Sequence, residues 1–246
     1  MPFLTTLKRK LSHRLRVRET PPAKAYDLWA PSYDAQPDNP ILLLDGLLFN
    51  ELLSATSLEG KRVVDIGCGT GRHWEALFRK NVAGCTGYEA SMEMLRKVRE
   101  KYPHAKTYLH SGHALKELEA GCCDVLVSTL VIAHIRNLSA EWREWNRVLK
   151  TGGDILLTDF HPVALQRGAN RSFMHGDRLV YIKNHVHTLD KIRSLAAKMS
   201  WKEVGFIESR IDGRVRHIFE RLDVMEAYKD SYDQLVLYGL HFKKEA

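Results

Sequence analysis

The sequence predicts an α/β fold in which a doubly wound, mostly parallel sheet carries helices on both faces. Two observations support this class. Residues 62–66 form a β-branched run that opens directly into a glycine-rich turn, and the run at residues 82–89 ends in an acid. From residue 91 onward helical and strand-like stretches alternate, as expected when each strand is followed by a helix that leads to the next parallel strand.

The glycine-rich turn follows the first predicted strand and reads Asp65-x-Gly67-x-Gly69-x-Gly71. Alternating glycines allow a sharp turn and let a ligand come close to the backbone. The dinucleotide fingerprint, Gly-x-Gly-x-x-Gly, would place its third glycine one residue later. The pattern therefore favours a nucleoside ligand other than NAD, the alternative being that the glycines only make a tight turn.

A second acid, Glu89, ends the next predicted strand, and Ser91 and Met92 then begin a helix. A carboxylate in this position can accept hydrogen bonds from both hydroxyls of a ribose. Strand, turn, helix, strand and terminal acid, in that order, predict a single nucleoside site.

This pattern resembles motif I of the class I S-adenosylmethionine-dependent methyltransferases, and a weaker resemblance extends over residues 25–245. It is similar to the small-molecule (type 11) group that includes the ubiquinone/menaquinone C-methyltransferases. The resemblance implies a Rossmann-like sheet of seven strands with an antiparallel last strand, and S-adenosylmethionine as cofactor. It assigns cofactor binding to Asp65, Gly67, Gly69, Gly71 and Glu89.

Residues 25–34 read AYDLWAPSYD, which is similar to a Tyr-Asp…Tyr-Asp segment that folds over the cofactor in this group. The resemblance adds Tyr26 and Tyr33 to the cofactor site. The spacing of Tyr26, Trp29 and Tyr33 is also that of an ordinary helix face packed on the core, so this alternative stays open. A later match, RVLKTGG at residues 147–153, resembles the family's turn with Thr151 in place of proline.

The adenine end of the site departs from the family pattern. Where the family has Gly-Asp-Ala after the third strand, this chain has Gly112-His113-Ala114. The family's acid accepts a hydrogen bond from the adenine amino group, and a neutral imidazole accepts such a bond less strongly than a carboxylate. We expect His113 and Ala114 to lie beside the adenine, with apolar packing from Met92.

Two histidines are candidates for a general base. The sulfonium of the cofactor is an activated methyl donor, so orientation dominates and a base is needed only when the acceptor must lose a proton. His161 follows the fifth predicted strand and His134 the fourth, at the edge where open α/β sheets bind ligands. We expect His161 to be the base. The alternatives are a turn cap before Pro162 for His161 and a buried structural role for His134.

Residues 161–187 interrupt the alternation of strands and helices and are long enough to form a lid over the substrate. Within this insertion, Arg171 and Phe173 are expected to contact the substrate. Further along, the pattern predicts helices near 189–202 and 215–228 and strands near 206–211 and 235–242. A helix over residues 40–54 is expected to cover the sheet.

Most of the net charge lies at the N-terminus. Residues 1–24 hold seven basic residues against Glu19, which accounts for +6 of the net +7. Leucines at positions 4, 7, 11 and 15 recur at helical spacing, so residues 1–18 can form a basic amphipathic helix. Such an arm could lie on an anionic membrane, pack on the domain or act in targeting. We divide the chain into an arm and linker, 1–24, and a methyltransferase-like domain, 25–246.

Composition excludes several other classes of protein. No apolar run reaches the length of a membrane span, and the four cysteines lack the spacing of a zinc site. His185 and His187 share a strand face, but no acid or cysteine completes a metal site. We expect a cytoplasmic protein that acts on a small molecule without a metal, and the arm would allow peripheral contact with a membrane surface. The alternatives are a nucleic-acid methyltransferase using the arm, which lacks support from any other basic stripe, and a cofactor-binding protein without catalysis.

Overall fold

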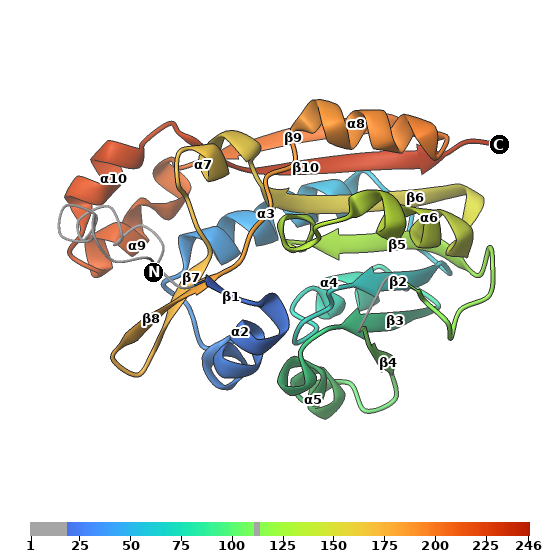
Figure 1. The fold of residues 1–246 in the computed structure, drawn as a ribbon, viewed down its shortest axis with the longest axis horizontal. Coiled ribbons are helices and arrows are strands. Elements are labelled where there is room, and N and C mark those ends of the chain that lie inside the picture. The colour runs from blue at the N-terminus through green and yellow to red at the C-terminus, as the bar shows by residue number, and fades with distance from the viewer. Residues whose placement is uncertain (1–18, 111–113) are drawn as a thin grey trace.

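A seven-stranded sheet organises residues 19–110 and 114–246, the parts of the chain that the computed structural model describes (Figure 1). Its strand order is β4-β3-β2-β5-β6-β10-β9. The strands are β2 (Arg62–Ile66), β3 (Gly84–Glu89), β4 (Lys106–Leu109), β5 (Cys123–Thr129), β6 (Leu149–Phe160), β9 (Trp201–Arg210) and β10 (Leu235–Lys244). Strands β2 to β6 pair in parallel, whereas β10 runs antiparallel to β6 and β9. The predicted fold class and its antiparallel last strand are confirmed.

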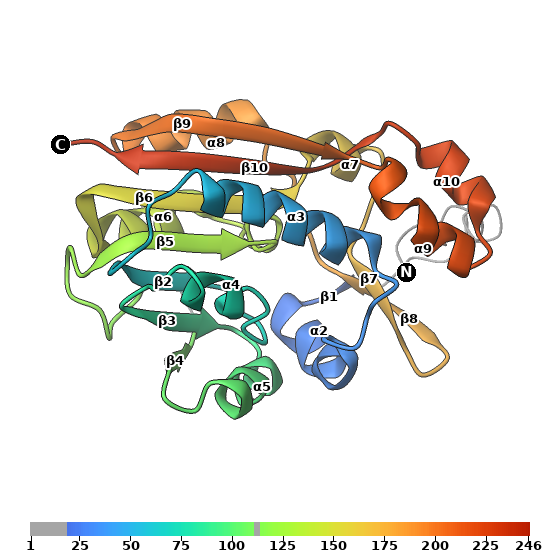
Figure 2. The same ribbon diagram turned by 180° about the vertical axis from the view of Figure 1, so that it is seen from behind.

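Alternate side chains of the central strands enter two separate cores, one on each face of the sheet. Val64 and Leu126 pack with α6 (Leu138–Val148) and α8 (Leu189–Lys198), which lie in front of the sheet in Figure 1. Val63 and Val125 pack with α3 (Pro40–Ser54), α4 (Trp74–Phe78) and α5 (Met92–Lys101), of which α3 and α4 face the viewer in Figure 2. Strands buried on both faces explain the continuous apolar runs of the sequence.

Helices α3 and α5 begin where the sequence supplies a side-chain cap. Asn39 accepts hydrogen bonds from the N–H groups of Ile41 and Leu42, so α3 starts at Pro40 as predicted. Ser91 accepts from the N–H of Met94 and starts α5 in the same way. Among the described residues, no helix has both the length and the apolar character needed to cross a bilayer.

Two segments depart from simple continuous elements: the helix expected over 215–228 and the second half of the insertion at 161–187. The helix expected over 215–228 divides into α9 (Arg216–Arg221) and α10 (Met225–Ser231), because Asp223 adopts a left-handed φ of 53° that ends the first helix. Within the insertion at 161–187, strand β8 spans Arg178–Ile182. Beyond it the chain leaves the sheet, and the N–H of His185 donates to the carbonyl of Ala133 at 2.7 Å.

A second, three-stranded sheet contains part of the insertion that the sequence predicts to be a lid, and we call it the lid sheet. Its strands are β1 (Glu19–Thr20), β7 (Ser172–His175) and β8, with α7 (Pro162–Gln166) leading into it. Strand β1 pairs in parallel with β8, and α2 (Pro22–Trp29) follows directly and lies beside the lid sheet in Figure 1. Residues 19–24, which the sequence assigned to a linker, are therefore part of the folded unit. The predicted arm, residues 1–18, lies outside the described residues.

Candidate cofactor and substrate site

The glycine-rich turn joins β2 to α4 in a conformation that requires glycine. Gly67, Gly69 and Gly71 have φ values of 72°, 55° and 71°, in the left-handed region that side chains disfavour. At Gly67 a Cβ would also lie 2.2 Å from Cγ2 of Val131. The N–H groups of Gly67 and Cys68 both donate to the carbonyl of Tyr88, at 2.7 and 3.1 Å. The turn is thus held against the end of the neighbouring strand.

Glu89 connects that strand end to the turn. Its carboxylate accepts from the N–H of Gly69 at 3.0 Å and from the N–H of Ser91 at 2.8 Å, one bond to each oxygen. Burial raises the pKa of Glu89, although these N–H groups and the nearby His110 oppose the shift. A carboxylate oxygen has room for a second donor, so both oxygens can still receive a hydroxyl from a ligand.

A cavity of about 500 Å³ opens at the carboxyl ends of β2, β3 and β5. This volume lies in the range of small-molecule and cofactor sites. Its position, outside the ends of parallel strands, is where open α/β sheets bind ligands. The lining residues include Gly67, Gly69, Glu89, Ala90, Met94, His110, Glu141, His134, Leu130, Tyr26 and Tyr33.

In the two Tyr-Asp pairs, the tyrosines line the cavity and the aspartates make hydrogen bonds within the fold. Tyr26 and Tyr33 line the cavity, with ring centroids 6.2 Å apart. Asp27 accepts from the Ser91 hydroxyl at 2.6 Å, and Asp34 accepts from the Thr70 hydroxyl at 2.6 Å. The aspartates therefore hold the aromatic segment onto the strand ends that carry Glu89 and the glycine turn. Both tyrosines lie where the sequence expected them.

Four other predicted cofactor residues do not line the cavity: Asp65, Gly71, Met92 and Ala114. Asp65 is buried beneath the turn, where it accepts from the indole N–H of Trp74 at 2.7 Å, and burial raises its pKa to about 7. Met92 is 49% exposed, and the cavity is lined by Met94 instead. Ala114 is exposed and lies outside the lining set. The fifth, His113, lies outside the described residues.

Two polar residues on the β4 side of the cavity were missed from the sequence. Glu141 is 5% exposed on α6, and its Oε2 lies 3.4 Å from Nε2 of His110, which directly follows β4. Both line the cavity. A signal for Glu141 exists in the sequence, because this acid falls within the buried stripe of α6 formed by Leu138, Trp142 and Trp145.

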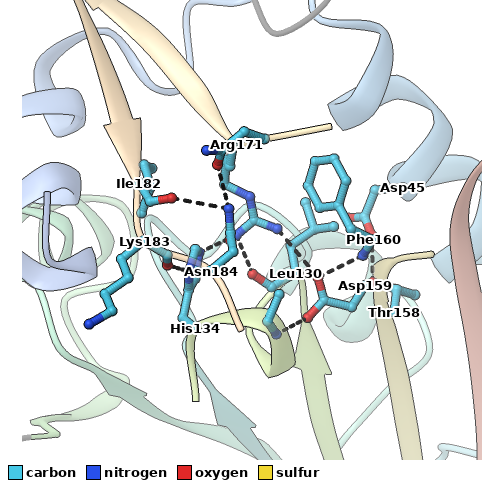
Figure 3. Close-up of polar contacts among 12 residues, drawn as sticks. Asp45, Leu130, His134, Thr158, Asp159, Phe160, Arg171, Ile182, Lys183 and Asn184 are labelled. Atoms are coloured by element: carbon cyan, nitrogen blue, oxygen red, sulfur yellow. Dashed lines mark hydrogen bonds and ion pairs between the residues drawn. The ribbon is translucent and has the colours of Figure 1, made fainter. Parts of the chain in front are cut away.

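At the opposite end of the cavity, Arg171 brings together four segments of the chain (Figure 3). This side chain is 5% exposed and enters from the lid, just before β7. Its Nη1 donates to the Tyr26 hydroxyl at 2.7 Å and to the Leu130 carbonyl, and also contacts Nε2 of His134. Its Nη2 lies 3.5 Å from Oδ1 of Asp159. Phe173, the other predicted substrate residue, stacks on Trp29 with 4.5 Å between the ring centroids and is not among the residues that line this cavity.

His134 lines the cavity, but both of its ring nitrogens are engaged. Nδ1 donates to the carbonyl of Lys183 at 3.0 Å, which leaves Nε2 to accept from Tyr26 and Arg171. Burial, reinforced by the positive charge of Arg171, holds the pKa of His134 well below its usual value. The imidazole is therefore neutral, and its only basic nitrogen faces a cation.

His161 lies away from the cavity, which corrects its prediction as the general base. It caps α7, with Nδ1 accepting from the N–H of Val163 at 3.2 Å. Its Nε2 donates to Glu208 on β9 at 3.1 Å, and burial lowers its pKa. No lone pair is left to take a proton from a substrate. The alternative role given by the sequence, a cap before Pro162, is the one it has.

The two other histidines of interest are also committed to the fold. Nε2 of His187 donates to the carbonyl of Ile135 at 2.7 Å, and the N–H of His185 donates to Ala133. Among residues 19–110 and 114–246 there is no group of three or more histidine, cysteine or acidic side chains that could hold a metal ion.

The cavity fits S-adenosylmethionine in its chemistry. An acid with free acceptor capacity lies at the end of β3 for the ribose, and the glycine turn leaves the backbone open beside it. His110 and Glu141 supply polar groups beyond the ribose acid, and Ala90 and Met94 supply apolar surface. Tyr26, Tyr33 and Leu130 then form the end at which methyl transfer would take place.

Comparisons with known proteins agree with this site. Residues 64–157 match the family model described as a methyltransferase domain. A demethylmenaquinone methyltransferase from Chlorobaculum parvum is 29% identical over 148 residues, which is 58% of this chain and 57% of that protein. The chain spans 35% to 62% of the lengths of three curated relatives that it matches.

Solved structures share the fold at low sequence identity. An S-adenosylmethionine-dependent methyltransferase from Mesorhizobium loti has a TM-score of 0.62 at 18% identity, covering 81% of this chain and 99% of its own. The [4+2]-cyclase SpnF has a TM-score of 0.65 at 18% identity, covering 94% of this chain and 98% of its own. The family match identifies residues 64–157 as part of a methyltransferase domain, which takes S-adenosylmethionine as its cofactor, and the solved structures show that the chain shares the fold of such enzymes.

Proposed function

We propose that this protein transfers a methyl group from S-adenosylmethionine to a small-molecule acceptor. The observation that carries the proposal is one cavity that runs from the ribose acid, Glu89, to the aromatic end formed by Tyr26 and Tyr33. The lid residue Arg171 closes that end through Tyr26 and Leu130, and an enclosed end suits a small acceptor rather than a polymer. The name of the Chlorobaculum relative, a demethylmenaquinone methyltransferase, supports the same class of acceptor.

The residues of the chain would act mainly by orientation. When bound, the cofactor supplies an activated methyl group, so a nucleophile held in line with that group gains most of the rate by proximity, about 7 to 11 kcal/mol. Glu89 and the glycine turn would fix the nucleoside. Tyr26 and Tyr33, held in place by Asp27 and Asp34, would exclude water from the methyl end.

Neither His134 nor His161 is arranged to act as a general base. We therefore expect His161→Gln to keep turnover within about threefold of the wild type, where a true base would contribute roughly 10² to 10⁴-fold. His134→Gln should lower turnover, because it disturbs Tyr26 and Arg171. Transfer of a radiolabelled methyl group under single-turnover conditions measures both. A hundredfold loss in the His161 variant would restore it as the base.

Binding and transfer can be tested in sequence. Saturating S-adenosylhomocysteine should raise the melting temperature by mass action, whereas NAD should not, because Gly71 arrives one residue early for a dinucleotide turn. A metabolite library with labelled cofactor then identifies the acceptor. Equal shifts with both ligands, or none with either, would refute the cofactor assignment. Cofactor binding without transfer to any small molecule would favour a role in which the cofactor is held but not used.

We also propose that residues 1–18 contact an anionic membrane on its cytoplasmic side. The six lysines and arginines of residues 1–18 supply the attraction, which salt should weaken. These residues lead directly into β1 of the lid, next to Pro21 and Pro22, which line the cavity. Such contact would bring the cavity to the membrane surface.

Vesicle binding tests the arm. Co-sedimentation with anionic vesicles should be lost when residues 1–18 are deleted, while affinity for S-adenosylhomocysteine should be unchanged. RNA in the same assay separates a nucleic-acid role. Vesicle binding that survives the deletion would show that the arm has another purpose.

A further inference from the structure

A second, much smaller cavity adjoins the aromatic end of the cofactor cavity. Its volume is about 20 Å³, and Tyr26, Tyr33 and Leu130 line both spaces. Its remaining walls include Phe160, Arg171 and Ser172. A space of this size holds one small polar group, such as a single water molecule or one oxygen of a ligand. The small cavity is therefore placed to receive one group of a methyl acceptor.

Two buried donors in this cavity have capacity that the protein does not use. The side chains of Arg171 and Ser172 belong to residues that are 5% and 3% exposed. Within the described residues, Nη2 of Arg171 and Oγ of Ser172 make no hydrogen bond. Asp159 is the acid nearest to Nη2: its Oδ1 lies 3.5 Å away and forms an ion pair with Nη2 without a hydrogen bond, and each of its oxygens accepts from one backbone N–H. Buried polar atoms nearly always have a partner, so these two point to a group that enters the cavity.

The chemistry of the two donors selects the kind of group. A guanidinium has only donors, and its planar edge matches a carboxylate. The Phe160 ring covers one face of the Arg171 guanidinium, with 4.9 Å between the Cζ atom and the ring centroid, so a ligand is directed to the edge. A positively charged amine would be repelled by Arg171. The neutral His134 next to it adds no charge that would oppose an anion, and burial raises the pKa of Asp159, the acid 3.5 Å from Nη2, although Arg171 opposes that shift.

Resting on the proposed methyl transfer, we propose that the acceptor is a small-molecule acid whose carboxylate binds Nη2 of Arg171 and Oγ of Ser172. Arg171 and Ser172 are then substrate-binding residues that set specificity for acids over neutral amides. The proposal also explains why Arg171 is buried in the lid: the same side chain that recognises the acceptor holds the lid to Tyr26 and Leu130.

The test uses the full chain saturated with S-adenosylhomocysteine, whose binding is first measured by calorimetry. Sodium acetate and acetamide, matched for size and for ionic strength, are then titrated and detected by saturation-transfer NMR of their methyl protons. Acetate should bind at least about tenfold more tightly than acetamide, because a charged acceptor bonds to Arg171 more strongly than a neutral one. Equal binding of the two probes, or no acetate binding, would mean that the cavity holds an ordered water only and would overturn the proposal.

Variants locate the acetate site. Arg171→Gln should weaken acetate binding by about 10 to 100-fold and Ser172→Ala by about threefold or more. Arg178→Gln, an exposed arginine of the same lid, is the matched control and should change nothing. Because Arg171 also supports the lid, Ser172→Ala carries the test if Arg171→Gln lowers the melting temperature. Acetate binding that is unchanged in both Ser172→Ala and Arg171→Gln would overturn the proposal. If the wild type does not bind S-adenosylhomocysteine at all, the cofactor function is refuted instead.

Discussion

The two ends of the cavity are built in different ways. At the cofactor end, the glycine turn, Glu89 and Met94 come from one stretch of thirty residues, and backbone geometry fixes their positions. The aromatic end is where we propose that the methyl acceptor binds, and we call it the acceptor end. There, Tyr26, Leu130 and Arg171 come from three segments far apart in the chain and meet through hydrogen bonds of the Arg171 side chain. The comparison teaches that the cofactor end depends on local spacing, whereas the acceptor end depends on how the lid packs.

This difference explains what the sequence could predict. Glu89 and Gly67 were identified because a strand, a turn and a second strand place them by spacing alone. His161 follows a predicted strand in the same way, yet its side chain turns to cap α7 and to bond Glu208. The direction of a side chain at a strand end depends on the neighbours it meets, which a strand pattern does not contain.

Contacts between distant segments were the other source of error. Strand β1 has only two residues and is defined by its pairing with β8, so the local sequence pattern does not predict a strand there. Arg171 was expected in the lid, but its bonds to Tyr26 and Leu130 join residues 145 and 41 positions away in the chain. Such partners are chosen by packing and not by spacing.

The largest expected effect is at Gly67, where the cofactor end is most strictly constrained. Gly67→Ala places a Cβ 2.2 Å from Cγ2 of Val131 at a φ of 72°, so strain and overlap should together cost roughly 2 to 5 kcal/mol. Calorimetry should show affinity for S-adenosylhomocysteine reduced by more than about 100-fold. Gly213→Ala, at a glycine with open space and without a positive φ, is the control. Similar behaviour of the two variants would show that the turn tolerates side chains.

Glu89 should give the next largest effect. Glu89→Gln keeps the shape but removes the charge that strengthens bonds to ribose hydroxyls, and should weaken S-adenosylhomocysteine binding by about 10 to 100-fold. Glu93→Gln, at a more exposed acid that pairs with Arg96 on α5, should leave the affinity unchanged. A loss below threefold at Glu89 would mean that the acid only supports the turn through Gly69 and Ser91.

Lowering the pH should reduce the stability of the fold through His73, which lies in the segment that follows the glycine turn. His73 bonds the buried Asp45 at 3.0 Å, and burial together with the Arg72 charge lowers its pKa to about 4. An unfolded histidine titrates near 6.5, so the unfolded chain gains a proton first, and stability falls as the pH drops from about 6.5 towards 4. This site alone should lose about 1 to 2 kcal/mol between pH 7 and pH 5.

Denaturant unfolding of the wild type and of His73→Gln measures this contribution. The variant should show a shallower loss of stability in that pH range. The same slope in both proteins would assign the acid sensitivity to other groups, such as His134 at the acceptor end. Asp45 acts in a different window: although burial opposes it, Arg72 lowers its pKa, so its contribution is lost only below about pH 4, where the unfolded acid protonates.

The smallest effect concerns adenine recognition on the β4 side. Glu141 lies in the cavity next to His110, where an acid can accept from the adenine amino group, the role that the family gives to an acid at the position of His113. Glu141→Gln should weaken S-adenosylhomocysteine binding by only about 3 to 10-fold, because an amide oxygen still accepts the bond.

Replacing the adenine of the ligand by another nucleobase tests the role of Glu141 more specifically than one affinity does. S-inosylhomocysteine carries an oxygen in place of the amino group, so it should bind the wild type more weakly than S-adenosylhomocysteine, since two acceptors would face each other. In Glu141→Gln the amide can donate to that oxygen, and the preference should narrow or reverse. Glu100→Gln, at an exposed acid of α5, should keep the wild-type preference. If Glu141→Gln keeps it too, the adenine is read by other groups, and the β4 side then resembles the acceptor end, where residues distant in the chain determine recognition.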